Sequence, residues 1–199
     1  MKMIAATRLG RAQRAMDSAV AFGNASEELF KQSEVEAPKE GGRDLFVVVS
    51  SDRGLCGGIH SSVSKKTRAA VAKLTKAGGE EPSVVVLGDK AKAQLSRALP
   101  KNLVLSFNQI GKGVPTYEDA LAITSTILKA DIPFDKINIV YNKYVSSLSF
   151  ESVISTVYSE KSLLEAPKFG AYEMDESLSK DLAEFSLTNS IFYTLVAVS

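Results

Sequence analysis

The side chains that most often carry chemistry are scarce in this chain of 199 residues, which has one cysteine, one histidine and no tryptophan. The single cysteine, Cys56, excludes an internal disulfide and multi-cysteine zinc sites. A Cys56–His60 pair has no evident orienting partner, so we expect a buried thiol and a surface histidine. The composition therefore predicts no catalytic residue, no metal site and no bound cofactor.

The chain also lacks an excess of charge of either sign, because its 24 Lys and Arg residues are balanced by 23 Asp and Glu residues, which leaves a net charge of +1. This balance argues against a generic nucleic-acid-binding protein. No apolar run approaches the roughly 18 residues that a membrane span needs, and the N-terminus lacks the apolar core of a signal peptide. With 45% hydrophobic and 24% charged residues, the chain has the composition of a globular protein with one sizeable core.

The first 30 residues predict a long helix, because small and apolar residues recur there at alternating spacings of four and three. The predicted coiled-coil seam is Ala5, Leu9, Ala12, Met16, Ala19 and Gly23. Arg8, Arg11 and Arg14 fall on the opposite side of this helix. A surface helix with a solvated basic face is the alternative.

Residues 175–199 predict a second helix with the same alternating spacing. Its predicted seam is Leu178, Leu182, Phe185, Phe192 and Val196. Residues 1–23 carry four basic side chains and one acidic, whereas residues 171–199 carry five acidic side chains and one basic. Opposite charge can bias the pairing of the two helices, although exposed ion pairs are too weak to drive it. The first helix begins without an N-cap, and the second ends without a glycine stop or a basic last turn, so we expect the chain to be a fragment.

Between these helices, residues 31–43 read as a polar linker and residues 44–174 as an α/β domain. Short apolar runs alternate there with helical patterns, and Thr116 with Asp119 resembles a capping box. Strands are expected at 45–50, 83–87, 103–107, 137–145 and 150–158, and helices at 59–76, 89–99 and up to residue 129. The alternation predicts a Rossmann-like, mainly parallel sheet flanked by helices, beside an antiparallel coiled coil formed by the terminal helices.

A glycine-rich loop, Ser51–Gly58, follows the first expected strand and opens into a helix, which is where α/β folds bind phosphate groups. Its spacing matches neither common phosphate-binding motif. One interpretation is a small phosphate- or nucleotide-binding protein that uses Gly54–Gly58. The other is a tight connection in which glycines allow close backbone packing.

The segments Ser51–Gly58, Met1–Leu9 and Ser146–Glu151 resemble the gamma subunits of rotary ATP synthases, and the similarity covers essentially the whole chain. The resemblance is strongest to mitochondrial, fungal members. It implies a non-catalytic rotor of the central stalk that couples rotation of the c-ring to conformational change in the catalytic alpha–beta hexamer. It also implies delta and epsilon stalk subunits as partners, and a peripheral location on the matrix side of the mitochondrial inner membrane, with no nucleic acid bound.

The resemblance further implies contacts with an acidic loop of the beta subunit at Arg53, Gly58, Lys65 and Arg68. Lys2, Arg8, Arg11 and Arg14 are added as contact candidates on charge grounds. Compared with the family pattern, helical turns before Met1, a targeting segment and a long helix after Ser199 are missing. We therefore expect the upper part of the shaft to be absent from this chain.

Overall fold

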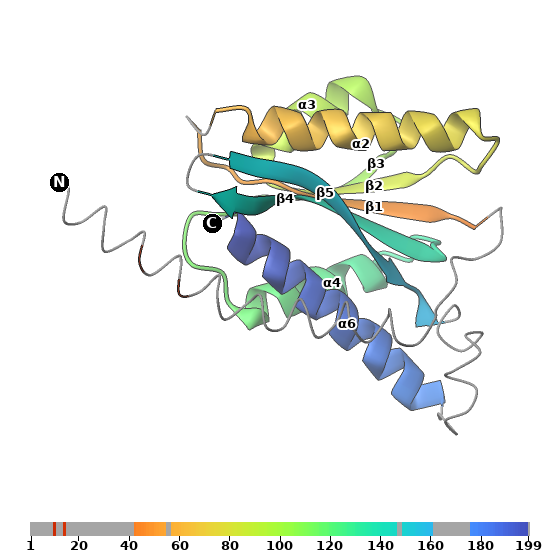
Figure 1. Ribbon diagram of the computed structural model, residues 1–199. Helices are drawn as coiled ribbons and strands as arrows, with labels where there is room; N and C mark the ends of the chain where they lie inside the picture. Colours follow the sequence, from red (N-terminus) through yellow and green to blue (C-terminus); the bar gives the residue numbers. More distant parts are fainter. Residues whose placement is uncertain are drawn as a thin grey trace.

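The computed structural model describes Gly10, Arg14 and residues 42–54, 57–146, 149–160 and 176–198. These residues form a three-layer α/β domain with a central five-stranded sheet (Figure 1). The strands are β1 (Asp44–Val49), β2 (Ser83–Leu87), β3 (Leu103–Phe107), β4 (Lys136–Ser146) and β5 (Ser149–Tyr158). Their order is β3-β2-β1-β4-β5, with all neighbours parallel except β5, which runs antiparallel to β4.

The described helices cover both faces of the sheet (Figure 1). Helices α2 (Ile59–Lys76) and α3 (Asp89–Ala98) lie on one face, and α4 (Tyr117–Lys129) and α6 (Glu176–Ala197) lie on the other. Helix α4 begins at the predicted capping box, in which Asp119 N–H donates to Thr116 Oγ1 and Thr116 N–H donates to the Asp119 carboxylate. The predicted mainly parallel α/β sheet with flanking helices is confirmed.

The core consists of two clusters, one on each side of the sheet, and β1 contributes to both. Every residue of β1 is buried. Leu45, Val47 and Val49 pack toward α4 and α6. Phe46 and Val48 pack toward α2 and α3. Because both faces are covered, the strand reads as a continuous apolar run instead of an alternating one.

Helix α6 is held on the sheet by a row of side chains spaced four residues apart. Leu187, Ile191 and Leu195 are at most 2% exposed and belong to the cluster shared with α4. Phe192, which the sequence assigned to the coiled-coil seam, packs against this cluster and makes an edge-to-face contact with Tyr117 on α4, at 5.8 Å between ring centroids. One side of α6 therefore packs into the core of the α/β domain, a contact that the coiled-coil prediction did not include.

The other predicted seam residues of α6 differ in exposure. Leu178 and Phe185 are each 54% exposed, Leu182 is half-buried and Val196 is buried. In the predicted N-terminal helix only Gly10 and Arg14 are described, and both are helical. Its seam residues and most of the predicted linker lie outside the described residues, so the pairing of the two helices remains a prediction.

Candidate contact site at the carboxyl edge of the sheet

The glycine-rich loop lies where the carboxyl ends of three parallel strands meet. Because β1, β2 and β3 are parallel, the segments that follow them emerge at the same edge of the sheet. Backbone hydrogen bonds join these segments to one another. The bonds run from Ser50 N to Leu87 O (2.8 Å), from Gly88 N to Phe107 O (2.9 Å) and from Asp52 N to Ile110 O (3.0 Å). The loop is thus tied to both neighbouring connections.

The carboxylate of Asp52 strengthens this link. One oxygen accepts a hydrogen bond from the Asp89 N–H at 2.8 Å, and the other accepts from the Gln109 N–H at 2.6 Å. Asp89 is the first residue of α3, and a helix N-terminus attracts negative charge. The Asp52 side chain therefore occupies the kind of position in which a Rossmann-type fold receives a phosphate group.

Two glycines allow the connections to approach each other closely. Gly88 has φ of +100°, and a Cβ placed there would lie 2.8 Å from the carbonyl carbon of Ser50. Gly111 has φ of +76°, and its Cβ would lie 2.8 Å from the Cβ of Ser51. Larger residues at these positions would collide with the segment after β1. The segments that follow β1, β2 and β3 are therefore packed against one another at this edge.

His60 was expected at the surface, and that expectation is wrong. The side chain is only 9% exposed, with Nδ1 3.1 Å from Ser50 Oγ and Nε2 2.9 Å from the Arg53 carbonyl oxygen. A carbonyl oxygen can only accept, so Nε2 carries a proton and donates to Arg53 O, while Nδ1 lies within hydrogen-bond distance of the Ser50 hydroxyl. The imidazole thereby holds the backbone beside Arg53 against the start of α2.

The first turn of α2 is anchored by a buried polar network. The amide of Asn142 on β4 donates to Ile59 O at 2.9 Å, and its oxygen accepts from the hydroxyls of Ser62 and Ser152 at 3.1 and 2.6 Å. The two serine hydroxyls are 2.8 Å apart. Because Ser62 belongs to α2 and Ser152 to β5, the network fixes the helix to the two strands. Side chains on the outer face of α2 are consequently displayed from a rigid base.

The structure brings four of the predicted contact residues to this edge and to the adjoining helix. Arg53 and Gly58 are exposed in the loop, and Gly58 is the N-cap residue of α2. Lys65 and Arg68 are exposed one turn apart on α2, and Arg68 Nε donates to Ser64 O at 3.4 Å. The three cations among them, Arg53, Lys65 and Arg68, are exposed along the loop and the helix.

The N-terminal candidates are covered only in part. Arg14 is exposed, and its Nε donates to Gly10 O at 3.1 Å. Lys2, Arg8 and Arg11 lie outside the described residues, as do the predicted seam residues Ala5, Leu9, Ala12, Met16, Ala19 and Gly23.

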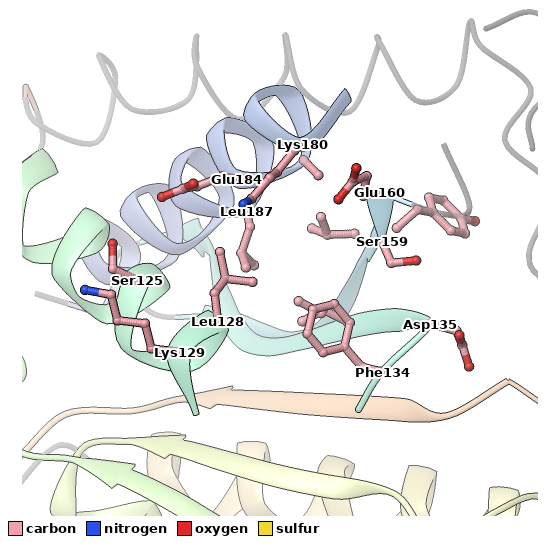
Figure 2. A pocket seen from close by; sticks show the side chains of 14 residues that line it. Ser125, Leu128, Lys129, Phe134, Asp135, Ser159, Glu160, Lys180, Glu184 and Leu187 are labelled. Atoms are coloured by element: carbon pink, nitrogen blue, oxygen red, sulfur yellow. The ribbon is translucent and has the colours of Figure 1, made fainter. Parts of the chain in front are cut away.

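A separate hollow of about 580 Å³ lies on the other face of the sheet, between α4, α6 and the ends of β4 and β5 (Figure 2). Leu128, Phe134 and Leu187 point into it, and Lys180 and Glu184 stand at the α6 side. At the opposite, N-terminal end of α4, burial and, to a smaller extent, the charge of Glu184 raise the pKa of Tyr117.

The described part of the chain offers no further chemistry of the common kinds. Within it, no three His, Cys, Asp or Glu side chains gather as metal ligands would. The helices seen in the structure include none that is both long and apolar enough to cross a membrane.

Sequence reasoning missed Asp52, His60 and Asn142 as the residues that build this edge. Asp52 and His60 do lie in and next to the glycine motif, so an acidic residue directly after a buried strand was a usable signal. Asp52 and Asn142 form hydrogen bonds with residues 57 and 83 positions away in the sequence, and no local pattern can indicate such partners.

A family profile and several known proteins that are similar to this chain all point to the same family. The profile of a family described as ATP synthase matches residues 1–199. A mitochondrial ATP synthase subunit gamma from Yarrowia lipolytica is 44% identical over 96% of this chain and 65% of its own length. The corresponding protein from Pichia angusta is 42% identical over 96% of this chain and 70% of its own length. The rat protein is 34% identical over 98% of this chain and 71% of its own length.

The chain thus spans about two thirds of the length of these relatives. Among solved structures, a chain from the central stalk and c-ring of the Tetrahymena thermophila mitochondrial ATP synthase superposes with a TM-score of 0.68. That match covers 94% of this chain and 91% of the other, at 18% identity. At such low identity the superposition supports the fold alone.

Proposed function

Since the chain belongs to the gamma-subunit family of mitochondrial ATP synthases, we propose that it is the central-stalk rotor of such an enzyme. In this role it couples rotation of a c-ring to conformational change in the alpha–beta hexamer, together with delta and epsilon subunits. It lies peripherally on the matrix side of the mitochondrial inner membrane. The observation that carries the proposal is the 44% identity to a mitochondrial gamma subunit across 96% of the chain.

The role is mechanical and not catalytic. The Asp52 carboxylate takes the amide groups of Asp89 and Gln109, and Gly88 and Gly111 bring backbone against backbone at the edge where Rossmann-type enzymes bind substrates. An edge that is held together by the chain's own groups favours a structural role over the alternative of a phosphate- or nucleotide-binding protein that uses Gly54–Gly58.

The contact with the beta subunit is proposed to run along the loop and α2. Arg53, Gly58, Lys65 and Arg68 offer cations and open backbone to an acidic loop, from a base fixed by His60 and Asn142. Long cationic side chains in solvent attract over several ångströms and separate at little cost, as a moving contact requires.

The test uses the full-length subunit in the assembled enzyme, with Lys65→Glu and Arg68→Glu combined. We expect ATP synthesis to fall relative to ATP hydrolysis, most strongly at low ionic strength, because the affected attraction is screened by salt. The matched control is Lys101→Glu with Lys129→Glu, which makes the same change in charge at exposed positions before β3 and at the C-terminal end of α4, away from this edge. Coupling that equals the control would remove Lys65 and Arg68 from the contact.

A second measurement separates the proposal from its alternative. Calorimetric titration of the chain with ATP, ADP and phosphate is expected to show no binding at micromolar concentrations, whereas a co-purification assay is expected to recover an alpha–beta hexamer. Micromolar binding of any of the three ligands, without the hexamer, would support the small-molecule-binding protein instead.

A further inference from the structure

The two helical layers of the domain carry opposite charge. Helices α2 and α3 together contain eight basic residues and one acidic, a net charge of +7. Helices α4 and α6 contain two basic residues and five acidic, a net charge of −3. The near-neutral sequence therefore conceals a strongly polarised molecule, with the positive charge concentrated in one layer.

The positive layer forms a continuous outer surface. We use the name basic face for the eight cations Lys65, Lys66, Arg68, Lys73, Lys76, Lys90, Lys92 and Arg97. All eight are exposed. On α2 they lie opposite the side that packs on the sheet, where Val63, Thr67 and Val71 are buried. Figure 1 shows α2 and α3 together on this side of the sheet, so their outer sides belong to one layer.

Within the described part of the chain, no ion pair neutralises these charges. Among the residues that the structure describes, the ion pairs are Arg43 with Glu80 and Lys136 with Asp44, and neither includes a member of the basic face. Neighbouring cations on one helix repel each other by a few tenths of a kcal/mol per pair. A layer with such repulsion, and with no ion pair to another described residue, is suited to an external anionic partner.

The composition of the basic face favours an acidic protein surface over a lipid surface. None of the large exposed apolar side chains of the described residues lies on α2 or α3; they lie on the other helices, on the strands and at Val114. A peripheral helix that binds a bilayer normally adds aromatic or aliphatic side chains that enter the headgroup region. Six of the eight cations are lysines, which act as point charges without the fork geometry that arginine offers to phosphate.

We propose that the whole basic face, beyond Lys65 and Arg68, is a docking surface for carboxylate side chains of a neighbouring protein subunit. The inference rests on the proposed rotor function, in which such a subunit faces the domain. The contact is diffuse and salt-sensitive, because it consists of separate lysine charges spread over two helices. This docking surface extends beyond Lys65 and Arg68 in the first half of α2 to Lys73, Lys76 and the cations of α3.

Zero-length carbodiimide coupling tests this directly, because the reagent joins a lysine amine only to a carboxylate in contact with it. In the intact enzyme that contains the full-length subunit, we expect Lys73 or Lys92 to couple to Asp or Glu residues of another subunit. The yield is expected to fall severalfold when ionic strength rises from about 0.05 to 0.5 M, as the Debye length shortens. Coupling only to carboxylates of this chain, or none at all, would overturn the proposal.

A matched pair of variants provides the second test. Lys73→Glu with Lys92→Glu is expected to weaken association of the subunit with the rest of the enzyme severalfold. Lys129→Glu with Lys180→Glu, which makes the same change in charge at exposed positions on α4 and α6, is not. Equal effects of the two pairs would contradict a localised surface. Neither test alters Lys65 or Arg68. The docking proposal can therefore fail while the synthesis-against-hydrolysis test of Lys65 and Arg68 succeeds, and it can succeed while that test fails.

The lipid alternative is an outcome of a third measurement. Sedimentation of the chain with phosphatidylcholine vesicles that contain 20% of an anionic phospholipid is expected to recover no more protein than vesicles without it. Recovery that depends on the anionic lipid and is abolished by Lys73→Glu with Lys92→Glu would assign the basic face to a membrane surface and overturn the proposal.

Discussion

Replacing Asp52 by alanine would remove the side chain that joins three connections at the carboxyl edge of the sheet. The substitution leaves the N–H groups of Asp89 and Gln109 without their carboxylate acceptor. A hydrogen bond to a charged group contributes ~1.5–3 kcal/mol when buried. Asp52 is half-buried, so water replaces part of each bond, and we expect a total loss of about 2 kcal/mol in the free energy of unfolding.

The near-isosteric Asp52→Asn is the sharper variant. An asparagine keeps one acceptor oxygen, but it turns an NH2 group toward the other backbone N–H, so two donors face each other. We therefore expect Asn to cost at least half as much as Ala, although the shape is unchanged. Urea unfolding followed by circular dichroism measures both, with an unchanged slope showing that the denatured state is the same.

The control is Asp181→Asn, which removes an equal charge from an exposed position on α6. It is expected to change stability by less than about 0.5 kcal/mol. If Asp52→Asn also stays within that range, the carboxylate is not the clamp that its two short hydrogen bonds indicate. Formate offers a further check, because a small carboxylate is expected to restore stability to Asp52→Ala and leave the parent chain unchanged.

Three further predictions concern the scaffold. Hydrogen bonds from the Thr116 backbone and side chain lower the pKa of Asp119. The stability that this capping contributes is therefore complete above the unfolded pKa of ~3.9 and is lost as pH falls through the lower folded pKa. Thr116→Ala should cost about 1 kcal/mol at pH 7 in urea unfolding and progressively less in acid. Gly88→Ala should cost about 3 kcal/mol, because its φ is +100° and its Cβ would collide with Ser50, whereas the open, solvent-facing Gly113 serves as control. Ile191→Ala should cost about 3 kcal/mol in the same assay, because the side chain is fully buried between α6 and the sheet, and a loss below 1 kcal/mol would contradict that packing.

The architecture of the domain could be predicted because its signals are local. The apolar run of β1 indicates a strand covered on both faces, and the Thr116–Asp119 spacing marks the start of α4 within the sequence itself. The strand and helix boundaries accordingly differ from the predicted ones by no more than a residue or two.

The chemistry of the carboxyl edge could not be predicted, because it depends on distant partners. Asp52 finds its two donors 37 and 57 residues further along the chain. The burial of His60 requires Ser50 and Arg53 to curl back over α2. A residue type alone cannot distinguish a solvated histidine from one that closes such a turn.

Helix α6 shows a different limit of sequence reasoning. Its alternating four-and-three spacing from Leu178 is present, but so is a row of three residues spaced by four, namely Leu187, Ile191 and Leu195. Both rows are compatible with a helix, and only the fold determines that the second faces the sheet. The first row stays a prediction for the interface with the N-terminal helix.

The seating of α6 also bears on how a turning force would pass through this molecule. Leu187, Ile191 and Leu195 are packed into the core between α6 and the sheet, so α6 cannot slide or rotate relative to the sheet without disrupting this packing. Over this stretch the helix and the sheet must turn as a single piece. Elastic wind-up during a power stroke would therefore be stored outside the segment from Leu187 to Leu195.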